Sequence, residues 1–273
     1  MTSRLQPHRP LWLRCDVHEI VEGLIQGLTE FLPVSSSGHL VIVPAMLGWE
    51  EPPLGLTVLL HMGTLVALLI YFRLEIIGLV LGVLGKGPDP AESRRIVRFL
   101  IIGTVPAVIA GVALGGFFEH AFERPYESSI ELFCTALILV ATEKLGERAV
   151  RHELDDTQAG AIGVAQAVAI LPGISRSGST IGTGLLAGLS REEATRFSFL
   201  LSLPAIGGAG VLDLAKGDLV ISAGSLTGTL VSGLVGFASI HYLLRFVRTH
   251  SLNVFAWYLF AFAPLSALVI WLR

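Results

Sequence analysis

The chain has 273 residues, of which 52% are hydrophobic and 15% are charged, and its mean hydropathy is +0.70. Soluble domains carry about 25% charged residues, so this composition excludes an ordinary soluble protein and favours a multi-pass membrane protein. The net charge of -3 gives no reason to expect nucleic acid as a partner. The two cysteines, Cys15 and Cys134, lie in unrelated contexts and imply neither a disulfide framework nor a metal cluster.

Apolar segments that cross about 30 Å of hydrocarbon need about 20 residues. Taken in chain order, such segments are expected at about 54–72, 96–118, 129–145, 195–214, 219–245 and 252–272. Two other apolar regions, 18–49 and 159–189, are interrupted by polar breaks, and their arms are too short to span. Each is predicted to be a re-entrant hairpin that enters the membrane and returns to the same side. The expected fold is a single membrane domain over 1–273, all-α, with about six transmembrane helices plus two re-entrant helical hairpins.

The basic residues support this arrangement. If the hairpins do not cross, the loops on one face hold most of the Lys and Arg residues: Arg73, Lys86, Arg94, Arg95, Arg98, Lys144, Arg148, Arg151, Arg191, Arg196, Arg245 and Arg248. The other face receives the smaller set: Arg4, Arg9, Arg14, Arg124, Lys216 and Arg273. The positive-inside bias predicts that the first face is cytoplasmic and that both termini lie outside.

The chain also contains an internal repeat. A shift of 140 positions pairs Gln26 with Gln166, Ser35 with Ser175, Ser37 with Ser177 and Gly38 with Gly178. Each copy, 18–145 and 159–272, comprises one hairpin and three crossings. Because three is odd, the two hairpins enter from opposite sides, which predicts an inverted-topology repeat. The copies differ in their polar groups, since Glu30 is paired with Ile170, Ser36 with Arg176 and His39 with Ser179.

The two breaks are expected to form one anion site. Non-helical backbone at membrane depth is tolerated only where protein or a polar cavity satisfies it, and a helix that starts after each break would point free N–H groups at the centre. With Arg176 between two such helix ends, phosphate is the expected ligand. The candidate catalytic residues are Glu30, Ser36, His39 and Arg176. The candidate phosphate-binding residues are Gln26, Ser35, Ser37, Gly38, Ser175, Ser177, Gly178 and Thr180.

Glu30 has no local partner in the sequence, and an unpaired carboxylate in a membrane is costly. Beside an anion site it is expected either to hold a divalent metal ion or to carry a proton. Taken alone, the serines are explained as helix caps and His39 as a packing residue, but the combination with Arg176 favours a functional site. Polar residues without a supporting motif are interpreted as packing or interfacial groups: His61, Glu143, Asp213 and His241.

The stretches "QGLTEFLPVSSSGH" (26–39) and "LPGISRSGST" (171–180) resemble the integral-membrane undecaprenyl-pyrophosphate phosphatases, also called bacitracin-resistance proteins. The resemblance covers essentially the whole chain, although Gln26 stands where the family has Glu or Gln, which leaves Glu30 as the sole motif carboxylate. The resemblance implies hydrolysis of undecaprenyl pyrophosphate to the monophosphate and inorganic phosphate. This reaction recycles the lipid carrier for bacterial cell-wall synthesis. It also implies a divalent cation, Mg²⁺ or Ca²⁺, without a dedicated cage, and a multi-pass protein of the bacterial inner membrane whose site opens toward the outer face.

The mechanism expected from these residues is nucleophilic attack by Ser36, with Glu30 or His39 assisting proton transfer. Attack by His39, or by water that Glu30 activates, stays open at this point. A transporter or flippase of a lipid phosphate or small anion is the alternative, because inverted repeats with broken helices are typical of carriers. The sequence leaves open whether two copies pair as a homodimer.

Overall fold

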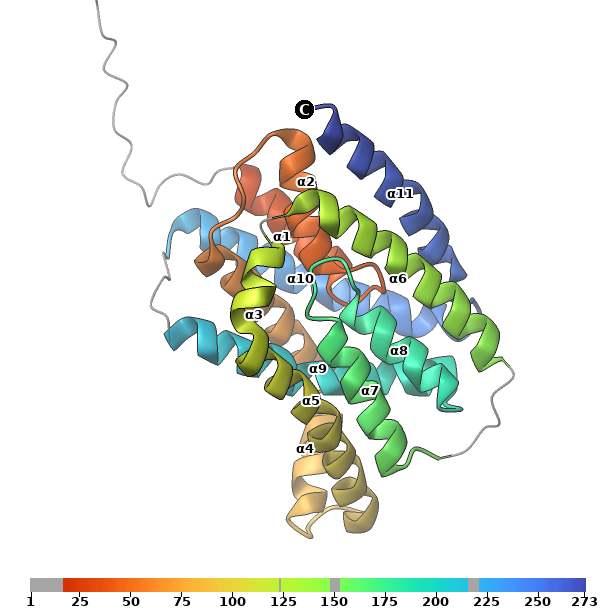
Figure 1. The fold of residues 1–273 in the computed structure, drawn as a ribbon. Coiled ribbons are helices and arrows are strands. Elements are labelled where there is room, and N and C mark those ends of the chain that lie inside the picture. Colours follow the sequence, from red (N-terminus) through yellow and green to blue (C-terminus); the bar gives the residue numbers. More distant parts are fainter. Residues whose placement is uncertain (1–16, 123, 148–152, 216–220) are drawn as a thin grey trace, which may run out of the picture.

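The computed structural model describes residues 17–122, 124–147, 153–215 and 221–273. Within these ranges the chain folds into α-helices and contains no β-strand (Figure 1). In chain order the helices are α1 (Val17–Thr29), α2 (Ser36–Leu47), α3 (Leu54–Tyr71), α4 (Arg73–Val83), α5 (Pro90–Phe122), α6 (Pro125–Gly146), α7 (Asp156–Val168), α8 (Arg176–Leu186), α9 (Arg191–Ala215), α10 (Ala223–Phe246) and α11 (Asn253–Trp271).

The long helices match the predicted crossings. In the described part of the chain, α3, α5, α9, α10 and α11 are long and apolar enough to span a membrane. The sixth predicted crossing, 129–145, lies in α6, whose 22 residues extend about 33 Å. Helix α6 lies outside that group and carries four charged residues, Glu127, Glu131, Glu143 and Lys144. The prediction of an all-α membrane protein is confirmed.

Helix α4 was not predicted. Its sequence, "RLEIIGLVLGV", is apolar but only 11 residues long, so a search for membrane-length segments treats it as part of a loop. The backbone of Phe72, at φ −94° and ψ 12°, separates α4 from α3. In Figure 1, α4 and the first part of α5 extend together away from the other helices.

The helices of the two hairpins are short. The lengths of α1, α2, α7 and α8 lie between 11 and 13 residues, so each extends only about 17–20 Å, less than the hydrocarbon core. Residues 30–35 separate α1 from α2, and residues 169–175 separate α7 from α8. Interrupted helices are therefore present where the sequence predicts them, and their return within the membrane stays a prediction.

Each hairpin packs on a long helix of the other predicted repeat. Helix α1 lies against α10, and α7 lies against α5. Glycines approach the facing backbone closely in both contacts: a Cβ on Gly23 would lie 2.4 Å from the carbonyl oxygen of Gly228, and one on Gly163 would lie 2.7 Å from that of Gly103. Gly23 and Gly163 are themselves 140 positions apart, so the same close approach occurs in both halves.

Alanine at Gly163 or Gly23 is therefore expected to lower thermal stability. A methyl group would overlap backbone of the facing helix, and the helices would have to separate at a cost of about 1–3 kcal/mol. The midpoint of thermal unfolding in detergent measures the effect. Gly111→Ala is the matched control, because a Cβ at Gly111 meets no atom within 4 Å and alanine favours the helix. Equal midpoints for Gly163→Ala and Gly111→Ala would contradict this packing.

Candidate active site

The two breaks contact each other directly. The Ser177 hydroxyl donates to the Leu32 carbonyl at 2.9 Å, and a Cβ on Gly38 would lie 3.1 Å from the Cα of Gly173. Thr135 of α6 fixes the second break from behind, since its hydroxyl donates to the Gly173 carbonyl at 2.8 Å and accepts from the backbone N–H of Ser175 at 3.0 Å. The juxtaposition expected from the sequence is thus present in the structure.

Serines cap both helices that begin after the breaks. The Ser35 hydroxyl accepts the Gly38 N–H at 3.3 Å, and the Ser175 hydroxyl accepts the Gly178 N–H at 3.0 Å. Ser35 has a positive φ of 68°, a conformation that costs a non-glycine residue energy and is often found at functional sites. The two N-termini therefore point their positive dipole ends at one region.

That region is a cavity of about 710 Å³. Its polar lining includes residues of both breaks, of the first turns of α2 and α8, and of α3: Glu30, Ser35, Ser36, Ser37, His61, Ser175, Arg176 and Ser177. Its apolar lining includes Met62 of α3, Phe118 and Phe122 of α5, and Ile206 of α9. A polar end with charged groups and an apolar remainder suit a ligand that has an anionic head and a hydrocarbon tail.

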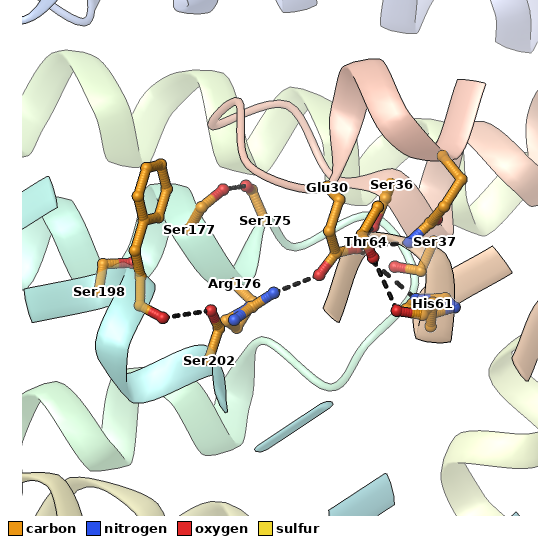
Figure 2. Close-up of polar contacts among 12 residues, drawn as sticks. Glu30, Ser36, Ser37, His61, Thr64, Ser175, Arg176, Ser177, Ser198 and Ser202 are labelled. Carbon is orange, nitrogen blue, oxygen red and sulfur yellow. Dashed lines mark hydrogen bonds and ion pairs between the residues drawn. The ribbon is translucent and has the colours of Figure 1, made fainter. Parts of the chain in front are cut away.

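Glu30 is the centre of the polar end (Figure 2). One carboxylate oxygen, Oε1, is ion-paired with Arg176. The other, Oε2, accepts from the Ser36 hydroxyl at 2.6 Å and from the Gln26 amide at 2.9 Å. The Glu30 side chain is only 3% exposed, so its charge depends on these partners. A hydroxyl held against a carboxylate, beside a guanidinium, would suit an activated nucleophile at an anion site.

His39 lies behind the first break and does not line the cavity. Its Nδ1 donates to the Ser35 carbonyl at 2.7 Å, and its Nε2 accepts from the Tyr258 hydroxyl of α11 at 2.7 Å. The ring also stacks on Phe262 with a centroid separation of 4.8 Å. With both nitrogens engaged, the imidazole holds the backbone of Ser35, the residue before Ser36. Tyr258 has no motif that would have revealed it in the sequence.

We expect Tyr258→Phe to lower by about tenfold the phosphate release that the sequence motifs predict. It removes one hydrogen bond, worth about 1 kcal/mol, and loosens the ring that holds the strained Ser35. The measurement is the initial rate of phosphate release. Tyr242→Phe is the control, because Tyr242 is 54% exposed on α10 and lines no part of the cavity. A rate for Tyr258→Phe equal to that of Tyr242→Phe would exclude the bracing role.

The remaining predicted residues form a supporting layer. Gln26 is fully buried and reaches Glu30 but not the cavity. Thr180 bonds the Ser198 hydroxyl at 2.6 Å and donates to the carbonyl of Arg176 at 2.8 Å. Gly178 contributes its backbone N–H to the cap on Ser175.

The interpretation of His61 as a packing or interfacial group does not fit its position in the structure. His61 lines the cavity, and its Nε2 lies 3.6 Å from Glu30 Oε2. No sequence signal marks His61 as a site residue, since it lies on α3, outside both motifs. Glu143 is ion-paired with Arg191 and accepts a hydrogen bond from the backbone N–H of Leu252. His241 bonds Tyr71 at 3.2 Å, and the Asp213 side chain lies outside the described residues.

The site residues that the structure describes do not form a metal cage. In the described part of the chain, no group of three or more His, Cys, Asp or Glu side chains is placed to hold an ion. Both oxygens of Glu30 are already engaged by Arg176, Ser36 and Gln26, and a guanidinium repels a divalent cation. The donor set therefore does not fit a metal ion held by Glu30.

Comparison with known proteins shows the family of the chain. The family model described as bacitracin resistance protein BacA matches residues 19–265. Curated relatives named undecaprenyl-diphosphatase include one from Chloroherpeton thalassium, 41% identical over 89% of this chain and 92% of the relative. Others come from Rubrobacter xylanophilus, 41% identical over 91% and 96% of the two chains, and from Myxococcus xanthus, 43% identical over 88% and 84%. With its interrupted hairpins, its paired motifs and these similarities, the chain belongs to the bacitracin resistance protein BacA family.

Proposed function

We propose that this protein hydrolyses undecaprenyl pyrophosphate to undecaprenyl phosphate and inorganic phosphate. One observation carries the proposal. Ser36, directly after the first break, and Arg176, directly after the second, both contact the Glu30 carboxylate in one cavity. A phosphatase of this kind recycles the lipid carrier used in cell-wall synthesis. The relatives' names support the substrate.

The first step would be attack by Ser36 on the terminal phosphorus. The hydroxyl proton passes to Glu30 Oε2, which it already contacts at 2.6 Å. The bond between the terminal phosphorus and the bridging oxygen breaks, which releases undecaprenyl phosphate and leaves phosphoserine. Protonation neutralises Glu30 and frees Arg176 to pair with the phosphoryl oxygens, where charge is concentrated in the transition state. Water then hydrolyses phosphoserine.

The apolar part of the cavity would receive the start of the prenyl chain. Phe118 and Phe122 of α5, Met62 of α3 and Ile206 of α9 line it beside the polar end. A hydrocarbon chain gains about 0.8 kcal/mol for each CH₂ removed from water, so these contacts would favour a lipid over a free pyrophosphate.

A divalent cation, Mg²⁺ or Ca²⁺, would enter as the counterion of the diphosphate rather than as a ligand of Glu30. This follows from the absence of a cage in the described residues and from the engagement of both Glu30 oxygens. As a test, the enzyme is treated with a chelator, and the chelator is then removed. Phosphate release should return to its full rate as soon as the complex of cation and substrate is added.

The site would open toward the outer face of the bacterial inner membrane. Ion pairs join the loops predicted to be cytoplasmic: Arg95 with Glu153 at 2.6 Å, Arg98 with Asp156 at 3.1 Å, Arg196 with Glu75 at 2.5 Å and Arg248 with Glu192 at 2.7 Å. Several basic residues of the charge argument lie outside the described residues: Arg4, Arg9, Arg14, Arg148, Arg151 and Lys216.

Release of inorganic phosphate from undecaprenyl pyrophosphate in detergent micelles tests the function. Micelles have no compartments, so phosphate release there is hydrolysis and not transport. We expect release by the purified wild-type chain. The absence of release, together with movement of lipid phosphate across liposomes, would contradict the proposal and support a carrier.

A further inference from the structure

His61 is held with one ring nitrogen free toward the cavity. Its Nδ1 lies 2.8 Å from the Thr57 carbonyl, and a carbonyl can only accept, so Nδ1 carries the proton. In the neutral ring Nε2 then has a lone pair. This Nε2 lies 3.6 Å from Glu30 Oε2, and the His61 side chain is 26% exposed within the cavity lining. Figure 2 shows Arg176 and His61 approaching Glu30 from opposite sides.

The second half of the proposed reaction needs two proton-handling groups. Lipid phosphate is a good leaving group and departs without a proton, but the Ser36 alkoxide is a poor one and has to be protonated as it leaves phosphoserine. Glu30 holds the proton it took from Ser36 and is the group in contact with that oxygen. It cannot also accept a proton from the attacking water, so a second acceptor is required.

We propose that His61 is the general base for hydrolysis of phosphoserine, an assignment that rests on the proposed function. Water gives a proton to His61 Nε2, and its oxygen bonds to phosphorus. The bond between phosphorus and Ser36 Oγ breaks, and Oγ takes the proton held by Glu30. Inorganic phosphate leaves, Glu30 is again a carboxylate paired with Arg176, and His61 loses its proton to water through the open cavity.

The other ionisable groups that line the cavity are less suited. Arg176 has no lone pair to offer. Glu51 lies on the exposed loop before α3, whereas His61 lies next to the carboxylate that Ser36 contacts. A Glu51→Gln variant is included in the experiment to separate the two acceptors.

The test is a rapid-quench experiment on the full chain in micelles, with undecaprenyl phosphate and inorganic phosphate measured separately. For His61→Gln we expect a burst of undecaprenyl phosphate close to one per enzyme and phosphoserine on Ser36. Steady phosphate release should then be slower by about 10² or more, the usual worth of a general base. In His61→Ala, added imidazole should restore phosphate release, because the cavity has room for the missing ring.

His241→Gln is the control, since His241 bonds Tyr71 away from the cavity, and it should behave as wild type. The burst itself shows that the variant is folded and binds substrate. The assignment would be overturned if His61→Gln showed no burst or an unchanged rate of phosphate release. It would also be overturned if phosphoserine accumulated in Glu51→Gln rather than in His61→Gln. No undecaprenyl phosphate from the wild type would instead disprove the proposed function, which keeps the two failures distinct.

Discussion

Replacing Ser36 with alanine is expected to lower phosphate release by about 10³ or more, because removing the proposed nucleophile leaves only binding and electrostatic contributions. Ser36 is partly exposed in the cavity, and its hydroxyl donates to the buried Glu30 at 2.6 Å. Alanine removes this hydroxyl with little change in volume. The measurement is phosphate release in micelles, together with undecaprenyl phosphate in a single turnover.

Ser128→Ala is the matched control for that variant. Ser128 is fully buried on α6, and its hydroxyl has no partner in the described structure, so alanine there should leave the rate and the stability close to wild type. Turnover by Ser36→Ala at a rate near that of Ser128→Ala would show that water, rather than Ser36, attacks phosphorus.

Arg176→Lys is expected to reduce the catalytic rate by about 10²–10³ while keeping the protein folded. Lysine retains a positive charge near Glu30 but loses the planar pair of donors that matches phosphoryl oxygens. Arg176→Ala should have a second effect, since it leaves the buried Glu30 charge without its partner and lowers stability by about 3–5 kcal/mol. The double variant Glu30→Gln with Arg176→Ala should regain stability and remain inactive.

The matched controls are Arg248→Lys and Arg248→Ala. Arg248 pairs with Glu192 at 2.7 Å, and its side chain is 58% exposed, so its ion pair contributes about 1 kcal/mol or less. Thermal unfolding and phosphate release are measured for the whole set. An Arg176→Lys enzyme with wild-type activity would show that the guanidinium does not hold the phosphoryl group.

The lengths of the apolar segments and the two motifs were sufficient to predict the broad arrangement of the helices. Apolar length predicts the long helices, and the polar breaks around Glu30 and Arg176 predict an interrupted hairpin in each half, because both signals are local in the sequence. The meeting of the breaks was predicted from the repeat, and the structure places Arg176 on Glu30. Helix α4 was missed because its 11 residues are shorter than a crossing.

The roles of the two histidines depend on contacts that are distant in the sequence. His39 belongs to the motif, but Tyr258, 219 residues away, engages its second nitrogen, and no local pattern reports that partner. His61 belongs to no motif, and it becomes part of the site only because α3 packs beside the hairpin of α1 and α2. Residue type and spacing thus identified groups capable of chemistry, whereas the direction of each side chain required the fold.

Denaturing the wild-type enzyme with SDS at neutral pH during turnover, followed by mass analysis of the peptide that contains residues 26–39, shows which residue becomes phosphorylated. Neutral pH is needed because phosphohistidine hydrolyses in acid. We expect phosphate bound to Ser36, and none in enzyme mixed with product alone. Phosphate on His39, or turnover with no phosphorylated residue at any quench time, would contradict it.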